Sequence, residues 1–160
     1  WDAFFEFYID TGSRKWGYPY LNRETFTLLG ERMSEDILLI LAMDGDTPIA
    51  GALNLIGGNT LYGRYWGCSD PRPFLHFETC YYQAIDFAIE NNLKTVEAGA
   101  QGGHKLARGY APVTTYSAHW IAHQGLRQAI DEYLIRERAA VENDVAYLQE
   151  RTPFRKPIIE

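Results

Sequence analysis

The sequence has little cysteine, no long apolar run and no excess of positive charge. Cys68 and Cys80 are the two cysteines among its 160 residues, whereas a small secreted domain held together by disulfides carries more. The longest apolar stretch runs from Ile37 to Met43, far short of the roughly 18 residues that a membrane-spanning helix needs. The net charge of −6 argues against a protein that coats nucleic acid. We therefore expect a globular protein of a reducing compartment, the cytoplasm.

Apolar and aromatic residues, by contrast, are plentiful. Hydrophobic residues make up 46% of the chain and aromatic residues 14%, which is enough to bury a core and excludes a disordered chain. No linker or internal repeat interrupts the sequence, so we expect one domain over residues 1–152 with a tail at 153–160. The chain begins with Trp1, and its first methionine is Met33. It is therefore either a processed product or a piece of a longer protein.

The first half of the chain predicts two helices followed by three strands. Apolar residues at one-turn spacing predict a helix over 2–10, and Asn22 is a suitable N-cap for a helix that ends near Met33. Two clusters of turn residues, 44–46 (DGD) and 57–59 (GGN), separate three apolar stretches. These stretches are predicted to form an antiparallel meander of strands over 37–43, 48–56 and 60–67. The first of them is apolar without alternation, so we expect both of its faces to be covered.

The second half predicts a helix, two more strands and a final helix. The predicted ranges are about 74–91 for the first helix, 93–99 and 113–122 for the strands, and 125–150 for the last helix. A meander followed by a helix that crosses over to another strand gives a mixed sheet with helices on both faces. The predicted fold class is therefore α/β, and its element order is that of the GNAT acyltransferase fold.

Three segments carry a more specific resemblance: EAGAQGGHKLARGY (97–110), GALNLIGGNTLYGRYWG (51–67) and FLHFETCYYQAIDFAIE (74–90). They resemble a predicted N-acyltransferase family of peptidoglycan biosynthesis proteins, relatives of Fem-type aminoacyltransferases with GNAT-like domains. The resemblance extends over about residues 7–154, and the chain looks like the C-terminal half of a longer member. It implies transfer of an acyl group to an amine, with acyl-CoA or aminoacyl-tRNA as donor. It also implies an N-terminal half-domain of the same protein as partner.

One loop departs from the acetyl-CoA pattern of GNAT domains. There, backbone N–H groups of a glycine-rich loop hold the pyrophosphate at a helix N-terminus. Here the segment reads GCSDPRPFLHF (67–77), in which Pro71 and Pro73 supply no N–H and Asp70 adds a negative charge. Arg72 is the compensating cation. This loop argues against an ordinary acetyl-CoA site, and so against the alternative of an acetyl-CoA-dependent small-molecule N-acetyltransferase.

Two carboxylates are candidates for a general base. Glu78 falls on the apolar stripe of the predicted helix, where burial would raise its pKa and suit it to deprotonate an amine. The alternative is a buried glutamate that is neutralised by Arg64 or by a tyrosine hydroxyl. Glu97 ends a predicted strand, and ligands of open α/β sheets gather at the carboxyl ends of strands.

A glycine-bearing segment after Glu97 is the candidate for binding an anionic donor or substrate. Its glycines permit close backbone approach, and its basic residues supply donors and positive charge. The candidate binding residues are Gln101, Gly102, Gly103, His104, Lys105 and Arg108, and Tyr110 is a candidate proton donor to the leaving group. The alternative is a glycine-rich connection whose basic residues are only solvated.

The remaining candidates are weaker. Arg64 on the third strand and His76 on the helix are possible donor-binding residues, and His76 shares a helix face with Cys80 at a spacing of four residues. No group of ligands has a metal-type spacing, so we expect no metal site. Ser117 and His119 share a strand face without the turn that a serine nucleophile needs. The loop over 14–18 can stack a base or sugar. A non-catalytic half-domain that binds substrate remains the other alternative to an enzyme.

Overall fold

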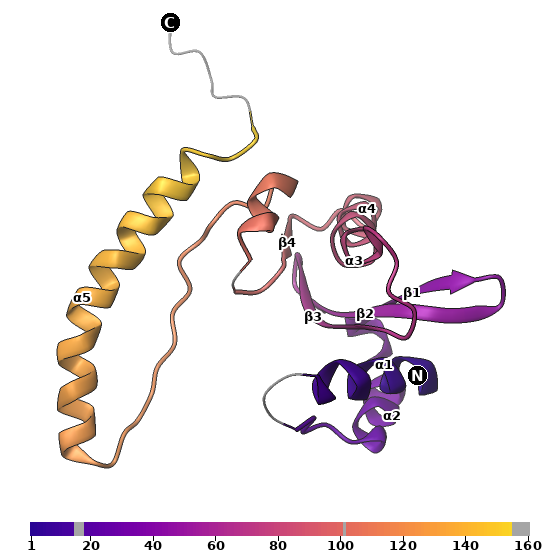
Figure 1. Ribbon diagram of the computed structural model, residues 1–160, viewed down its shortest axis with the longest axis horizontal. Helices are drawn as coiled ribbons and strands as arrows, with labels where there is room; N and C mark the ends of the chain where they lie inside the picture. The colour runs from indigo at the N-terminus through magenta and orange to yellow at the C-terminus, as the bar shows by residue number, and fades with distance from the viewer. Residues whose placement is uncertain (15–17, 101, 155–160) are drawn as a thin grey trace, which may run out of the picture. The chain divides into compact units, whose positions relative to one another are not determined.

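The computed structural model describes residues 1–14, 18–100 and 102–154, and the chain divides into two compact units (Figure 1). The first unit, Trp1–Ala100, contains a sheet with helices on both faces, and the second is Gln101–Glu160. No described helix is both long and apolar enough to cross a membrane. Whether both units belong to a single domain, as the sequence predicts, stays a prediction.

The sheet of the first unit has four strands in the order β1-β2-β3-β4. β1 (Ile37–Asp44), β2 (Thr47–Gly57) and β3 (Thr60–Cys68) form an antiparallel meander, and β4 (Thr95–Glu97) pairs with β3 in parallel. The two predicted turns join the strands of the meander, and each places a glycine, Gly45 or Gly58, at φ +57°. The predicted α/β fold is confirmed: a mixed sheet flanked by helices, consistent with a GNAT-like arrangement.

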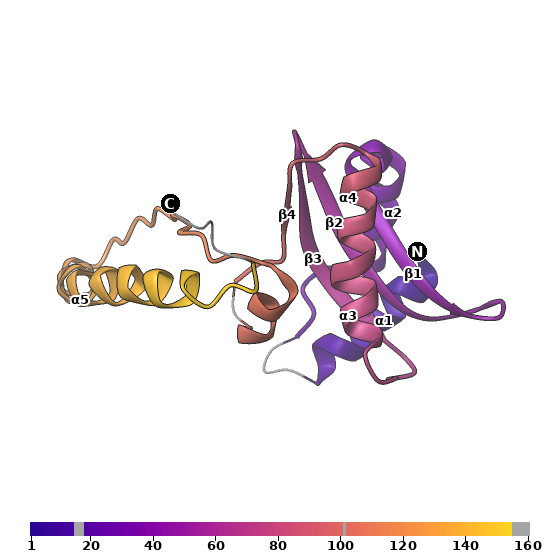
Figure 2. The same cartoon turned by 90° about the horizontal axis from the view of Figure 1, so that it is seen from above.

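Two helices, α1 (Asp2–Ser13) and α2 (Arg23–Arg32), cover one face of the sheet (Figure 2). The predicted cap is present, since the Thr25 N–H donates to Asn22 Oδ1 at 2.9 Å. A short 3-10 helix, η1 (Ser34–Asp36), leads from α2 into β1. The core on this face is formed by aromatic and aliphatic side chains that are almost fully buried: Phe4, Phe7, Tyr8, Phe26 and Leu53.

A single run of helix covers the other face, as Figure 2 shows. It begins as α3 (Leu75–Phe77), widens into the π-helical turn η2 (Glu78–Tyr82) and continues as α4 (Gln83–Glu90). Tyr81, Ala84 and Ala88 are its buried apolar residues. Their spacing of three and four residues is that of an amphipathic helix.

The predicted burial of both faces of β1 is wrong. β1 is an edge strand, and its side chains are half-buried or exposed, with Met43 51% exposed. The reason is visible in Figure 1, where the far end of the β1–β2 hairpin extends beyond the helices.

The second unit contains a 3-10 helix, η3 (Gly103–Arg108), and the long helix α5 (Gln124–Gln149). α5 confirms the predicted last helix, and it has no buried residue within the described chain. The predicted strand over 113–122 is wrong, because residues 110–123 have no regular structure. Alternating side chains form a strand only where a neighbour supplies a hydrogen-bond ladder, and none of the described segments pairs with this one.

Candidate functional site

β3 and β4 separate partway along β3. The two strands pair from Thr60 with Thr95 to Tyr62 with Glu97, and β3 continues to Cys68. A Cβ atom on Gly63 would lie 3.3 Å from the Glu97 carbonyl oxygen, so the glycine lets the end of β4 approach closely. Beyond Gly63, β3 continues past the end of β4.

A bulge lies at the point of separation. On β2, Leu53 is opposite Tyr65 and the next residue, Asn54, is opposite Gly63, which leaves Arg64 as an extra residue in β3. Bulges of this kind re-aim side chains and occur often next to functional sites. The Arg64 guanidinium lies over the Tyr65 ring, 5.2 Å from its centre. Among the described residues, the ion pairs do not join Arg64 to Glu78, its expected partner, or to Glu97.

A cavity of about 500 Å³ lies beside this part of β3. Most of its wall is aromatic, and Arg64 contributes a cation. The lining residues are Tyr8, Thr11, Gly12, Tyr18, Pro19, Tyr20, Arg64, Tyr65, Trp66 and His76. A concave, largely apolar surface with a few polar groups is typical of a ligand site.

Two tyrosine hydroxyls meet in the cavity wall. Tyr20 and Tyr65 share a short hydrogen bond between their hydroxyl groups. Burial and the Tyr20 hydrogen bond raise the pKa of Tyr65 from 10.0 to about 12. Behind them the Tyr8 ring packs edge-on against Tyr65, 5.2 Å between centres, and the Tyr8 hydroxyl accepts the Leu21 N–H at 3.2 Å. The Tyr65 hydroxyl is therefore neutral at physiological pH.

His76 contributes the imidazole of the cavity wall. Its ring packs edge-on against Trp66, 5.0 Å between centres, and its Nδ1 lies 3.4 Å from the Cys80 Sγ. The predicted shared face of His76 and Cys80 is confirmed. Burial raises the pKa of the Cys80 thiol to about 12, so this cysteine is protonated at neutral pH.

The predicted burial of Glu78 is wrong. Its side chain is exposed, and Thr79 is buried beside it. Glu78 opens the π-helical turn: its carbonyl accepts the Gln83 N–H, and its carboxylate accepts the Gln83 side-chain amide at 2.8 Å. The wider turn rotates Glu78 away from the buried face, so the desolvation that the base argument needs is missing.

Glu97 is half-buried at the end of β4, where it pairs with Tyr62 of β3. It is thus beside the point at which β3 and β4 separate. Its role as a general base stays a prediction.

The candidate anion-binding residues lie in the second unit, apart from Gln101, which lies outside the described residues. Gly102 precedes η3 with φ +100°, as a glycine permits. Gly103 to Arg108 form η3 itself, in which the Arg108 Nη1 donates to the His104 carbonyl at 2.8 Å. Burial lowers the pKa of Lys105. Tyr110 follows the turn, and its N–H donates to the Lys105 carbonyl at 3.2 Å. The roles of Gln101 to Arg108 in binding and of Tyr110 in proton donation stay predictions.

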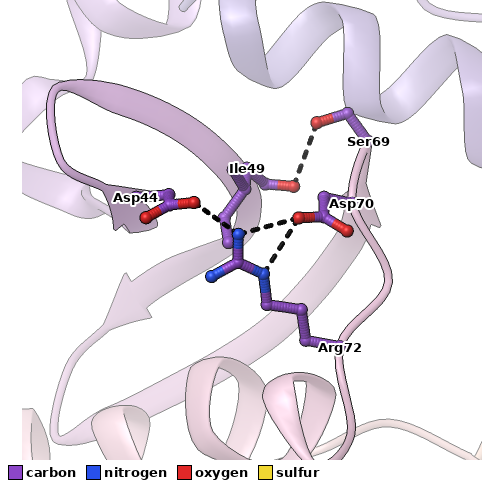
Figure 3. Close-up of polar contacts among 5 residues, drawn as sticks. All are labelled: Asp44, Ile49, Ser69, Asp70 and Arg72. Atoms are coloured by element: carbon purple, nitrogen blue, oxygen red, sulfur yellow. Dashed lines mark hydrogen bonds and ion pairs between the residues drawn. The ribbon is translucent and has the colours of Figure 1, made fainter.

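The loop after β3 uses its polar groups internally, as Figure 3 shows. The Ile49 carbonyl accepts the Ser69 N–H at 2.9 Å, the Asp70 N–H at 3.5 Å and the Ser69 hydroxyl at 3.3 Å. Arg72 pairs with Asp44 at 2.5 Å and with Asp70 at 2.8 Å. The cation and these two N–H groups are therefore already engaged, which strengthens the argument against a pyrophosphate site here.

Two weaker candidates gain little from the structure. The His119 Nε2 and Ser117 Oγ are 2.9 Å apart, and both residues are exposed. In the described ranges, no group of three or more His, Cys, Asp and Glu residues is placed to hold a metal ion.

Sequence reasoning missed the tyrosine side of the cavity. Tyr8, Tyr20 and Tyr65 come from α1, a loop and β3, and nothing in their spacing joins them. The one signal was the loop over 14–18, of which Tyr18 lines the cavity and residues 15–17 lie outside the described chain.

Comparison with known proteins points in the same direction as the resemblance. The model of the FemAB_like family, described as peptidoglycan biosynthesis/recognition, matches residues 1–156. No curated protein and no solved structure matches the chain. The family match extends over nearly the whole chain, through both compact units. The chain therefore belongs to the FemAB-like family.

Proposed function

We propose that the protein transfers an acyl or aminoacyl group to an amine in the metabolism of peptidoglycan-type precursors. Membership of the FemAB-like family supports the substrate class. The observation that carries the proposal is the aromatic cavity beside β3, where Arg64 and His76 face a space of about 500 Å³. A space of this size holds a ligand of drug-like dimensions.

In the proposed reaction, the amine attacks the carbonyl carbon of the acyl donor, and the C–N bond forms as the bond to the leaving group breaks. The carbonyl oxygen gains negative charge, which hydrogen-bond donors in the cavity stabilise. Arg64, His76, Trp66 and the tyrosine hydroxyls of the cavity wall are side chains that can donate. Glu97 accepts the amine proton, directly or through a water molecule, and then gives it to the oxygen of the leaving group, which restores the carboxylate. The step needs no covalent enzyme intermediate, so neither cysteine acts as a nucleophile.

The donor in this proposal is aminoacyl-tRNA. Its rival is acyl-CoA, whose pyrophosphate would need the loop after β3. Arg72 of that loop pairs with two carboxylates, and the Ser69 and Asp70 N–H groups donate to Ile49. An N-terminal half-domain of the same protein is the proposed partner.

A transfer assay on the full-length protein tests the proposal. The donors are acetyl-CoA, a long-chain acyl-CoA and aminoacyl-tRNA, and the acceptor is an amine-bearing cell-wall precursor, with the product read by mass spectrometry. We expect product with aminoacyl-tRNA, and a loss of about 100-fold in kcat for Glu97→Gln, since general bases contribute about 10²–10⁴-fold. Glu90→Gln, exposed at the end of α4, is the matched control. Full activity of Glu97→Gln would remove the proposed base.

A second candidate is recognition of a cell-wall precursor without chemistry. The aromatic wall of the cavity favours it, because aromatic rings bind sugar and peptide groups without any catalytic residue. Binding of the precursor, together with no product from any of the three donors, would select this function over transfer.

A further inference from the structure

The long helix α5 has an apolar stripe in which no described side chain is buried. Its members recur at steps of three, four or seven residues and are Leu126, Ile130, Leu134, Val141, Val145 and Leu148. At about 100° per residue they fall within an arc of about 100°, which is the width of the core-facing side of an amphipathic helix. Leu126 is 53% exposed and Val141 is 41% exposed. A helix of this kind gains most of its stability by packing its apolar side against another element, so the stripe needs a partner.

Charged residues along one edge of the stripe indicate the nature of that partner. In chain order they are Arg127, Asp131, Arg138 and Glu142, and all four are exposed. Their signs alternate, and the spacings between them are four, seven and four residues. The series therefore has the same spacing from either end, but with every sign reversed. A second α5 that runs in the opposite direction meets this edge with the opposite charge at each position, because a twofold axis brings each edge against its own copy.

We propose that the partner of the stripe is a second copy of this chain, bound through α5 in an antiparallel pair. In the matching register, Leu134 of one copy is level with Ile135 of the second copy. Arg127 then lies opposite Glu142 of the second copy. In the same way Asp131 lies opposite Arg138 of the second copy, and the twofold axis repeats both pairs. Residues 124–145 of the two helices overlap in this register, over a length of about 33 Å.

The same register brings the two apolar stripes together. At the centre, Leu134 comes next to Leu134 of the second copy. On either side, Ile130 lies beside Val141 of the second copy, and Leu126 lies between Val141 and Val145 of the second copy. This interdigitation removes apolar area of both helices from water. The charged edge then fixes register and direction, as the charged positions beside the seam of a coiled coil do.

Glu137 argues against a parallel pair. It lies within the arc of the stripe, and the Tyr133 hydroxyl of the same helix donates to its carboxylate at 3.5 Å. In a parallel pair without stagger, Glu137 would lie beside Glu137 of the second copy, and like charges that face each other are destabilising. In the antiparallel register the two carboxylates are separated by about five residues along the helix axis, or about 7.5 Å. This inference does not depend on the proposed transfer reaction.

The oligomeric state of the full-length protein tests the inference. Sedimentation equilibrium should show a dimer at micromolar concentration. Arg127→Glu should raise the dissociation constant of the dimer about 10-fold, because like charges then face each other at two places. The double variant Arg127→Glu/Glu142→Arg should restore association to that of the wild type. Arg136→Glu, exposed on the opposite side of α5, is the matched control and should leave the dissociation constant unchanged.

Crosslinking tests the register without any change of charge. Under mild oxidation Leu134→Cys should form a disulfide-linked dimer, whereas Asn143→Cys, exposed on the opposite side of α5, should not. Cys68 and Cys80 are present in both variants, so any dimer formed through them appears equally in the two. A wild-type protein that stays monomeric overturns the proposal and assigns the stripe to a contact within one chain. A dimer in which the folded double variant does not recover, or in which Leu134→Cys does not crosslink, also overturns it.

Discussion

The cavity at Arg64–Trp66 and the loop at Ser69–Phe74 are neighbours in sequence but differ in how they use their polar groups. In the loop, two N–H groups donate to the Ile49 carbonyl, and Arg72 pairs with Asp44 and Asp70. Beside the cavity, the Arg64 guanidinium lies over an aromatic ring, and His76 presents an imidazole to the same space.

This difference in the use of polar groups indicates which of the two regions is better suited to bind a ligand. A hydrogen-bonding group that already has a good partner gains little from a ligand, because it must give up one bond to form another. The resemblance to GNAT domains places this loop where acetyl-CoA enzymes have their phosphate-binding loop, yet its polar groups bond to the β1–β2 hairpin and to one another. The cavity corresponds to no part of that acetyl-CoA pattern, yet its aromatic and cationic wall makes it the better candidate for a ligand site.

The largest expected effect comes from Gly67, which lies between the two regions. A Cβ atom there would lie 2.6 Å from the Phe7 carbonyl carbon of α1, so Gly67→Ala forces helix and strand apart. We expect a loss of about 3 kcal/mol in the free energy of unfolding, typical of severe overpacking, measured by urea denaturation. Gly103→Ala is the matched control, because a Cβ there meets nothing within 4 Å. Equal stability of both variants would show that α1 does not pack this closely on β3.

The next effect separates binding from stability. Arg64→Ala should weaken binding of a non-hydrolysable aminoacyl-tRNA analogue about 10-fold, since a charged hydrogen bond contributes about 1.5–3 kcal/mol. Its Tm should stay close to that of the wild type, because Arg64 is exposed. Arg32→Ala, exposed at the end of α2, is the matched control. An unchanged Kd for Arg64→Ala would remove the cavity from donor binding.

A third effect concerns the tyrosine pair and alkaline pH. Because the pKa of Tyr65 is raised to about 12 in the folded protein, the folded state holds this proton more tightly than the unfolded state does. The resulting stabilisation is complete below pH 10 and is lost as the pH rises toward 12. Absorbance at 295 nm should show a late-titrating signal that falls by one tyrosine in Tyr65→Phe. In Tyr20→Phe it should titrate earlier, and an unchanged titration there would contradict the role of the Tyr20 hydrogen bond.

The smallest effect is expected in the loop. Arg72→Ala removes two exposed ion pairs, which salt screens and which contribute little to stability. We expect a slight fall in Tm that shrinks further at high salt, and no change in the Kd for the aminoacyl-tRNA analogue. A loss of donor affinity comparable to that of Arg64→Ala would reverse the comparison and return the loop to the binding site.

Local features of the fold could be predicted from the sequence. The Asn22 cap, the glycines of the two turns and the meander between them depend on neighbouring residues, and all are present. Local sequence could not decide whether residues 113–122 form a strand, because a strand depends on a partner that is remote in sequence.

The candidate site was harder to predict, because one extra residue in a strand and one in a helix decide which side chains line it. Sequence patterns predict which side chains are buried by assuming a regular strand or helix period. The bulge at Arg64 and the π-helical turn from Glu78 each add a residue to that period, so the side chains near them face directions that the pattern does not predict. His76 and Arg64 were among the predicted binding residues and do line one cavity, but their tyrosine neighbours meet only through the tertiary structure.

The π-helical turn has a consequence for sequence variation in the family. A turn of this kind corresponds to one residue added to an ordinary α-helix. Deleting one residue within Glu78–Tyr82 would restore a regular helix and rotate Leu75–Phe77 by about 100° relative to α4. His76 would then leave the cavity wall, and a deletion at Glu78 or Thr79 would also change its spacing of four residues to Cys80. The length of this helix should therefore vary together with the identity of residue 76, and relatives that are one residue shorter here should lack the histidine.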